Sequence, residues 1–147
     1  MIVEKMTESH LNEVVKIEEK SFTNPWSRES FYEELLKPLS FKFVALENGK
    51  VVGFAVLDTV LDEGNLLDIA VDESYRRNGV GRILMNALFE VAKEKSLSFI
   101  TLEVRESSSP AIALYEAFGF ERVGMRKNYY SKPNENALLM TKYFEKV

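Results

Sequence analysis

Apolar residues recur at helical spacing most clearly between residues 80 and 92. Their positions follow i, i+3, i+4, i+7, i+8, i+11 and i+12, so they share one face of a helix. The residues on this face are Val80, Ile83, Leu84, Ala87, Leu88, Val91 and Ala92. The segment therefore predicts an amphipathic helix with one side packed on a core.

The first 40 residues predict a strand followed by two helices. Ile2 to Met6 is short and apolar, and the apolar residues that follow, as far as Phe22, recur at mostly helical spacing. Asn24-Pro25-Trp26 breaks this first helix, and Ser27 is placed to cap a second one that Pro38 ends. The acidic residues of the two helices are interpreted as solvated faces: Glu18, Glu19, Glu33 and Glu34.

Three apolar runs then predict strands. Phe41 to Glu47 and Val51 to Leu57 are joined by Asn48-Gly49, a strong hairpin signal, and should pair antiparallel. A turn cluster, Asp62 to Asn65, leads to the compact strand Leu66 to Val71.

The second half predicts a strand–helix–strand crossover and a final hairpin. Ser98 to Val104 returns as a strand after the long helix, so it should lie parallel to Leu66 to Val71. Ser109-Pro110 begins a short helix that Gly119 ends. Phe120 to Arg126 and Ala137 to Phe144 are the last two strands, on either side of a polar loop that contains Tyr129, Tyr130 and Pro133. The fold class is therefore α/β, with a mixed sheet of about six or seven strands and helices on both faces.

Composition limits the function. A chain of 147 residues with 46% apolar and 29% charged residues matches one soluble globular domain, which we expect to span residues 1–147. The formal net charge of -4 disfavours a nucleic-acid or membrane surface, because phosphate attracts positive charge. The chain has no cysteine and one histidine, His10, so no metal site is expected. No apolar run reaches the ~18–20 residues that span a bilayer, so we expect a cytoplasmic location.

A glycine turn carries the first chemical signal. Gly79-Val80-Gly81 follows a strand and opens the long helix, where free backbone N–H groups and the helix dipole attract an anion such as phosphate. Arg76, Arg77 and Arg82 add positive charge beside the turn. The pattern alone is weak, because Leu84 stands where a dinucleotide fingerprint has its third glycine. A tight turn with solvated arginines is the alternative.

Several motifs together resemble one family. Arg76-x-x-Gly79-x-Gly81, Glu103-Val104-Arg105 and Ala113-Leu114-Tyr115-Glu116-x-x-Gly119-Phe120 resemble the GCN5-related N-acetyltransferase (GNAT) superfamily over nearly the whole chain. Four further motifs resemble its ribosomal-protein alanine N-acetyltransferases (RimI type): Asn24-Pro25-Trp26-Ser27, Ile69-Ala70-Val71-Asp72, Leu102-Glu103-Val104-Arg105 and Asn128-Tyr129-Tyr130.

The resemblance implies a fold and a cosubstrate. The sheet would be mostly antiparallel and splayed at one parallel strand pair, where acetyl-CoA enters as if it were another strand. The implied cofactor-binding residues are Ile69, Ala70, Val71, Arg76, Arg77, Asn78, Gly79, Val80, Gly81, Arg82 and Ser108. Ser108 departs from the asparagine of the close relatives and has a shorter reach.

The resemblance also implies the reaction. Glu103 would be the general base and Tyr115 the general acid in acetylation of a protein N-terminus, such as the N-terminal alanine of a small-subunit ribosomal protein. Because the pKa of a tyrosine, near 10, exceeds that of a thiol, about 8.5, Tyr115 is better interpreted as a hydrogen-bond donor to the leaving thiolate. The implied substrate-binding residues are Pro25, Trp26, Tyr129 and Tyr130.

Alternatives remain open from the residues themselves. Glu103 fits a solvated strand end, Tyr115 a core aromatic, and Tyr129-Tyr130 a strand-end pair. The nearest rival among enzymes is acetylation of a lysine or a small-molecule amine on the same scaffold. A non-catalytic acetyl-CoA sensor is the rival from another class, although the presence of both Glu103 and Tyr115 argues against it.

Overall fold

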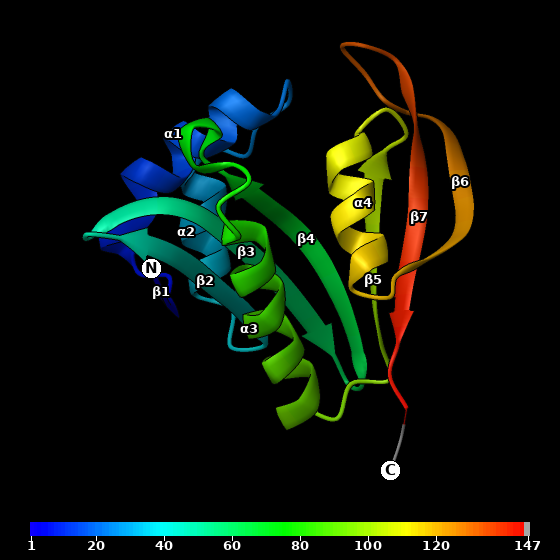
Figure 1. The fold of residues 1–147 in the computed structure, drawn as a ribbon, viewed down its shortest axis with the longest axis horizontal. Helices are drawn as coiled ribbons and strands as arrows, with labels where there is room; N and C mark the ends of the chain where they lie inside the picture. Colours follow the sequence, from blue (N-terminus) through cyan, green and yellow to red (C-terminus); the bar gives the residue numbers. More distant parts are fainter. Residues whose placement is uncertain (146–147) are drawn as a thin grey trace.

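Seven strands form a single mixed sheet in the computed structural model, which describes residues 1–145 (Figure 1). The strand order is β1-β2-β3-β4-β5-β7-β6, and one neighbouring pair, β4 with β5, is parallel. The strands are β1 (Ile2–Lys5), β2 (Ser40–Glu47), β3 (Lys50–Val60), β4 (Glu63–Val71), β5 (Phe99–Arg105), β6 (Glu121–Tyr130) and β7 (Glu135–Tyr143). The mixed sheet and its parallel pair confirm the sequence prediction.

Four α-helices and two 3₁₀ turns connect the strands of the described chain. They are η1 (Glu8–His10), α1 (Leu11–Ser21), α2 (Arg28–Leu35), η2 (Glu73–Tyr75), α3 (Val80–Glu94) and α4 (Ser109–Ala117). Within residues 1–145, no helix is long and apolar enough to cross a membrane.

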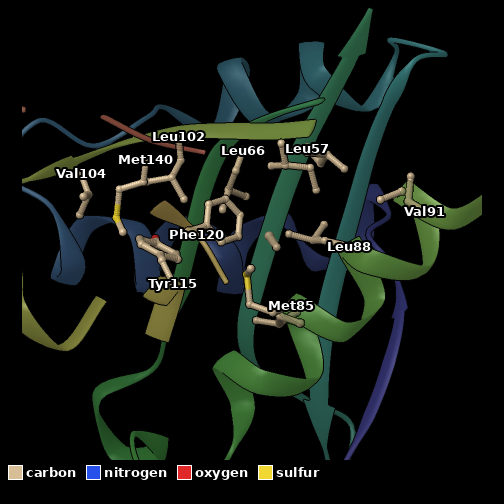
Figure 2. Close-up of a cluster of buried hydrophobic side chains, with 14 of the residues drawn as sticks. Leu57, Leu66, Met85, Leu88, Val91, Leu102, Val104, Tyr115, Phe120 and Met140 are labelled. Carbon is tan, nitrogen blue, oxygen red and sulfur yellow. The ribbon is translucent and has the colours of Figure 1, made fainter. Parts of the chain in front are cut away.

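The helices cover opposite faces of the sheet, because side chains along each strand alternate between two hydrophobic clusters. On β3, Ala55 and Leu57 join a cluster with α3 and α4, whereas Phe54 and Val56 join a cluster with α1 and α2. Figure 2 shows the first cluster, in which Leu57 and Leu66 of the sheet meet Leu88 of α3. The apolar residues at helical spacing therefore form the face of α3 that packs on the sheet.

The parallel pair separates soon after it forms. Glu63 to Asn65 of β4 pair with Phe99 to Thr101 of β5, and the ladder ends there. Beyond this point the two strands diverge, with β5 staying on β7 and β4 on β3 (Figure 1). The facing edges of the two carboxyl-terminal halves are thus free to accept an extended ligand between them.

Two predicted boundaries are wrong. The expected turn over Asp62 to Asn65 is mostly strand, since β3 runs to Val60 and β4 begins at Glu63. Gly64 is small for packing, because a Cβ there would lie 3.0 Å from side-chain atoms of Ile100 and Leu97. The expected loop at Tyr129 and Tyr130 is wrong, since both residues lie at the end of β6.

Candidate active site

A cavity of about 460 Å³ lies where β4 and β5 diverge. Its walls come from the end of α1 and the loop before α2, from β4 and β5, from the start of α4, and from the ends of β6 and β7. Six residues singled out from the sequence line it: Trp26, Ile69, Glu103, Ser108, Tyr115 and Tyr130. The splay therefore brings together side chains that are far apart along the chain.

Glu103 reaches the cavity from β5 with about a third of its side chain exposed. Its Oε1 lies 3.8 Å from Nε of Arg126 on β6. A hydrogen bond to Glu103, followed by the charge of the same carboxylate, raises the pKa of the Tyr129 hydroxyl. Glu103 is thus a partly exposed carboxylate with a donor and a cation beside it, which suits a group that exchanges protons with a ligand and with water.

Tyr115 is different, because it belongs to the core. Its residue is 7% exposed, and its ring centroid lies 5.8 Å from that of Phe120 (Figure 2). Burial, then the nearby charges of Asp68 and Tyr130, raise the pKa of Tyr115 well above its usual range. The hydroxyl is therefore protonated at neutral pH and acts as a hydrogen-bond donor.

The aromatic pair at the end of β6 divides between the cavity and the surface. Tyr130 lines the cavity, and its ring stacks 4.5 Å from Cζ of Arg105. Burial, then the charge of Glu103, raises its pKa to about 12. Tyr129 is half exposed and does not line the cavity, and neither does Pro25 of the loop before α2.

Two residues of the predicted cofactor strand have different surroundings. Ile69 faces the cavity, whereas Ala70 is buried in the cluster under α1 and α2. Ser108 lines the cavity at the start of α4, and its hydroxyl makes no capping hydrogen bond to that helix. A polar group is therefore available where the sequence pattern expects one.

The glycine turn lies outside this cavity and opens α3. Gly79 is the N-cap residue with φ of +78°, and a Cβ built there meets nothing within 4 Å. Gly81 instead allows a close approach of helices, since a Cβ would lie 3.0 Å from Cδ2 of Leu114 on α4. Arg77 has φ of +68°, and Arg76 lines a neighbouring cavity of about 280 Å³. The turn is shaped to leave backbone N–H groups approachable at the positive end of α3.

Arg105 connects the loop before α2 to the turn after β6, a role that its position in a sequence motif did not reveal. Its Nη1 donates to Glu135 Oε1 at 3.2 Å, and its Nη2 donates to Ser131 O at 3.0 Å and Thr23 Oγ1 at 3.2 Å. Thr23 belongs to the loop before α2, and Ser131 to the turn after β6.

The interpretation of Glu18 and Glu34 as solvated is wrong, since they are 2% and 4% exposed. Glu18 lines the cavity and faces Asp68 of β4, which is 8% exposed. The position of Glu18, seven residues after the buried Leu11, was a signal that it lies on the apolar face of α1.

Known proteins are similar to this chain in sequence and in fold. Residues 11–120 match the Acetyltransferase (GNAT) family. The chain is 38% identical over 139 residues, 94% of its length and 92% of the relative's, to the putative [ribosomal protein bS18]-alanine N-acetyltransferase of Bacillus subtilis. It is 38% identical over 126 residues, 84% of each chain, to the [ribosomal protein bS18]-alanine N-acetyltransferase of Escherichia coli. The crystal structure of the ribosomal-protein-S18-alanine N-acetyltransferase from Escherichia coli superposes with a TM-score of 0.91 at 33% identity, covering 99% of this chain and 95% of that one.

Proposed function

Because the chain belongs to the GNAT acetyltransferase family and is an N-acetyltransferase, we propose that it transfers the acetyl group of acetyl-CoA to the N-terminal α-amine of a protein. The proposed acceptor is the N-terminal alanine of a small-subunit ribosomal protein, after the relatives named above, and the proposed location is the cytoplasm. One observation carries the chemistry: a partly exposed carboxylate and a buried, protonated tyrosine line the same cavity at the splay.

The slot between β4 and β5 fits an extended thioester cosubstrate. Acetyl-CoA supplies an acetyl group already activated as a thioester, so no covalent enzyme intermediate is needed. The free edge of Leu66 to Val71 offers backbone groups to its pantetheine arm, and the α3 turn with Arg77 and Arg82 offers N–H groups and positive charge to its pyrophosphate.

Glu103 acts as the general base in this proposal. An α-amine has a pKa near 7.7–8.0, so a carboxylate, directly or through one water, removes a weakly held proton. Its partly exposed side chain allows that proton to pass on to solvent.

Tyr115 stabilises the leaving group. The raised pKa of its hydroxyl makes it a poor proton source but a permanent hydrogen-bond donor, which suits the thiolate of coenzyme A. Trp26 and Tyr130 line the cavity, Pro25 and Tyr129 are their neighbours in the chain, and the acceptor peptide is proposed to bind along these four residues.

A peptide panel tests the acceptor. The protein is incubated with acetyl-CoA and peptides that begin with alanine, with other residues, or with a blocked α-amine and internal lysines, and products are identified by mass spectrometry. We expect acetylation of free N-terminal alanine and none of the blocked peptide, since at pH 7 only about one lysine in two thousand is neutral. Efficient modification of the blocked peptide would overturn the acceptor assignment.

A further inference from the structure

Two buried carboxyl groups meet at the floor of the cavity. Glu18 comes from α1 and Asp68 from β4, and both are more than nine-tenths buried. Both line the cavity that holds Glu103 and Tyr115, yet the proposed reaction uses neither. Two acidic groups that the chain keeps out of water at such a place require a physical explanation.

The contacts of Glu18 and Asp68 leave one oxygen of each without a hydrogen-bond donor. Glu18 Oε2 accepts the backbone N–H of Trp26 at 2.9 Å. The other oxygen, Glu18 Oε1, and Oδ2 of Asp68 are buried and have no hydrogen-bond partner among the described residues, while the two carboxyl groups face each other within hydrogen-bonding reach. Two carboxylates offer only acceptors, whereas one proton between them gives both oxygens a partner.

Burial and the neighbouring carboxyl group of Glu18 favour that proton on Asp68. Burial, then the hydrogen bond and charge of Glu18, raises the pKa of Asp68 to about 10, against a smaller opposing effect of the Ile69 N–H. The titratable groups that line the same cavity are Glu103 and Arg105 of β5, Tyr115 of α4, Tyr130 of β6 and Glu135 of β7. Arg105 is the one cation among these lining residues, and it is bonded to Glu135.

The pair is connected to the wall of the cavity. Trp26, whose backbone N–H donates to Glu18, packs against Phe31 with the rings tilted and their centroids 5.1 Å apart. Two residues earlier, Asn24 Nδ2 donates to Ser131 O at 3.0 Å across the cavity. The segment Asn24 to Trp26 is thus bonded to α1 at one end and to the turn after β6 at the other.

We propose that Glu18 and Asp68 share a single proton and serve as a positioning pair that holds the Asn24–Trp26 segment in place to bind the acceptor peptide. This inference rests on the proposed function for its kinetic consequence, but its structural part does not. Loss of the proton sets two like charges against each other, which pushes the end of α1 away from β4 and releases Trp26.

Trp26 provides a readout that needs no activity, because it is the one tryptophan in the chain. Its fluorescence is followed as a function of pH in the wild type and in Asp68→Asn, whose amide is a donor at every pH. We expect an alkaline transition near the pKa of about 10 in the wild type and its loss in Asp68→Asn. The same transition in Asp68→Asn would overturn the shared proton.

Asp58→Asn is the matched control. Asp58 also faces a buried glutamate, Glu34, but Lys37 and Lys42 lie beside that pair, and it is outside the cavity. This variant should keep the wild-type fluorescence transition, and tyrosine ionisation, common to all variants, is subtracted by the comparison. Loss of the transition in Asp58→Asn as well would count against an assignment to Asp68.

Kinetics test the positioning role. Asp68→Leu removes the donor and should raise KM for the peptide roughly tenfold while changing kcat and coenzyme A affinity little, and Asp68→Asn should restore KM. Coenzyme A binding by calorimetry verifies that each variant is folded. A loss confined to kcat, or wild-type KM in Asp68→Leu, would overturn the role. If the wild type acetylates no peptide N-terminus, the proposed function fails, and the fluorescence result still decides whether the proton is shared.

Discussion

The sheet consists of two arms that differ in how they are built and in what they contribute. The first arm, β1 to β4 with α1 to α3, is covered on both faces, and all of β3 from Val51 to Leu57 is buried. The second arm, β5 to β7 with α4, ends in β6, which is exposed from Glu121 to Tyr129. Figure 1 shows them side by side, joined where β4 meets β5.

The two arms contribute to two different tasks, binding of the cosubstrate and transfer of protons. Apart from Ser108, the proposed cofactor groups, the edge of β4 and the amino end of α3, lie on the first arm, whereas Glu103 and Tyr115 lie on the second. Binding of the cosubstrate and transfer of protons should therefore respond to different substitutions.

The largest expected effect is on the second arm. Glu103→Gln should lower kcat roughly 10²–10⁴-fold because the base is lost, and the loss should shrink as pH rises and more amine is already neutral. Affinity for coenzyme A, measured by calorimetry, should be unchanged. Glu121→Gln, on exposed β6, is the control with the same change of charge. Wild-type turnover of the Glu103→Gln enzyme at neutral pH would remove Glu103 from its role.

The next prediction compares the stability of the arms. Leu88 is fully buried on α3, so Leu88→Ala should lower the unfolding free energy by about 2–5 kcal/mol. Val123 is half exposed on β6, so Val123→Ala should change the unfolding free energy by no more than about 0.5 kcal/mol. Urea denaturation measures both. Equal losses would show that the arms are equally packed.

Gly79 tests the first arm's share in binding. A valine at φ of +78° costs roughly 1–2 kcal/mol of backbone strain, so either the turn shifts or the helix end frays, and coenzyme A binding should weaken about tenfold or more. Gly49 in the hairpin turn has φ of +81° and the same open surroundings. Gly49→Val should therefore cost similar stability but leave binding intact. Equal binding losses in the two variants would place the phosphate site elsewhere.

The smallest expected effect concerns Asp58 on β3. Burial, then its hydrogen bond to Glu34, raises the pKa of Asp58 to about 6, so between pH ~4 and about 6 the folded chain holds a proton that the unfolded chain has lost. This contribution to stability is complete below pH ~4 and is lost as pH rises through about 6. Asp58→Asn should flatten that slope in thermal unfolding. An unchanged slope would mean that Asp58 is ionised throughout.

Much of the fold was readable because its signals are local. The apolar face of α3, the Asn48-Gly49 hairpin and the crossover from β4 to β5 follow from spacing and turn residues alone. Glu103 and Tyr115 came from the family resemblance, and the structure finds them at one cavity. Their roles as base and donor stay predictions.

Other features depended on neighbours distant in sequence. Glu18 looked solvated because its partner, Asp68, lies 50 residues further along the chain, on a strand rather than on the same helix. Gly64 looked like a turn because the side chains it makes room for, Leu97 and Ile100, belong to the far side of the crossover. Only the folded arrangement of helix and sheet reveals such contacts.

In the proposed binding mode, the short β4–β5 ladder also links the folding equilibrium to the supply of coenzyme A. Three residue pairs form the backbone ladder between the arms, and the edges beyond them gain backbone partners only when an extended ligand enters. A ligand that binds the folded chain alone adds about 2.7 kcal/mol of stability at one hundred times its dissociation constant. The fraction of intact enzyme, and hence its survival against proteolysis, should then follow the supply of coenzyme A.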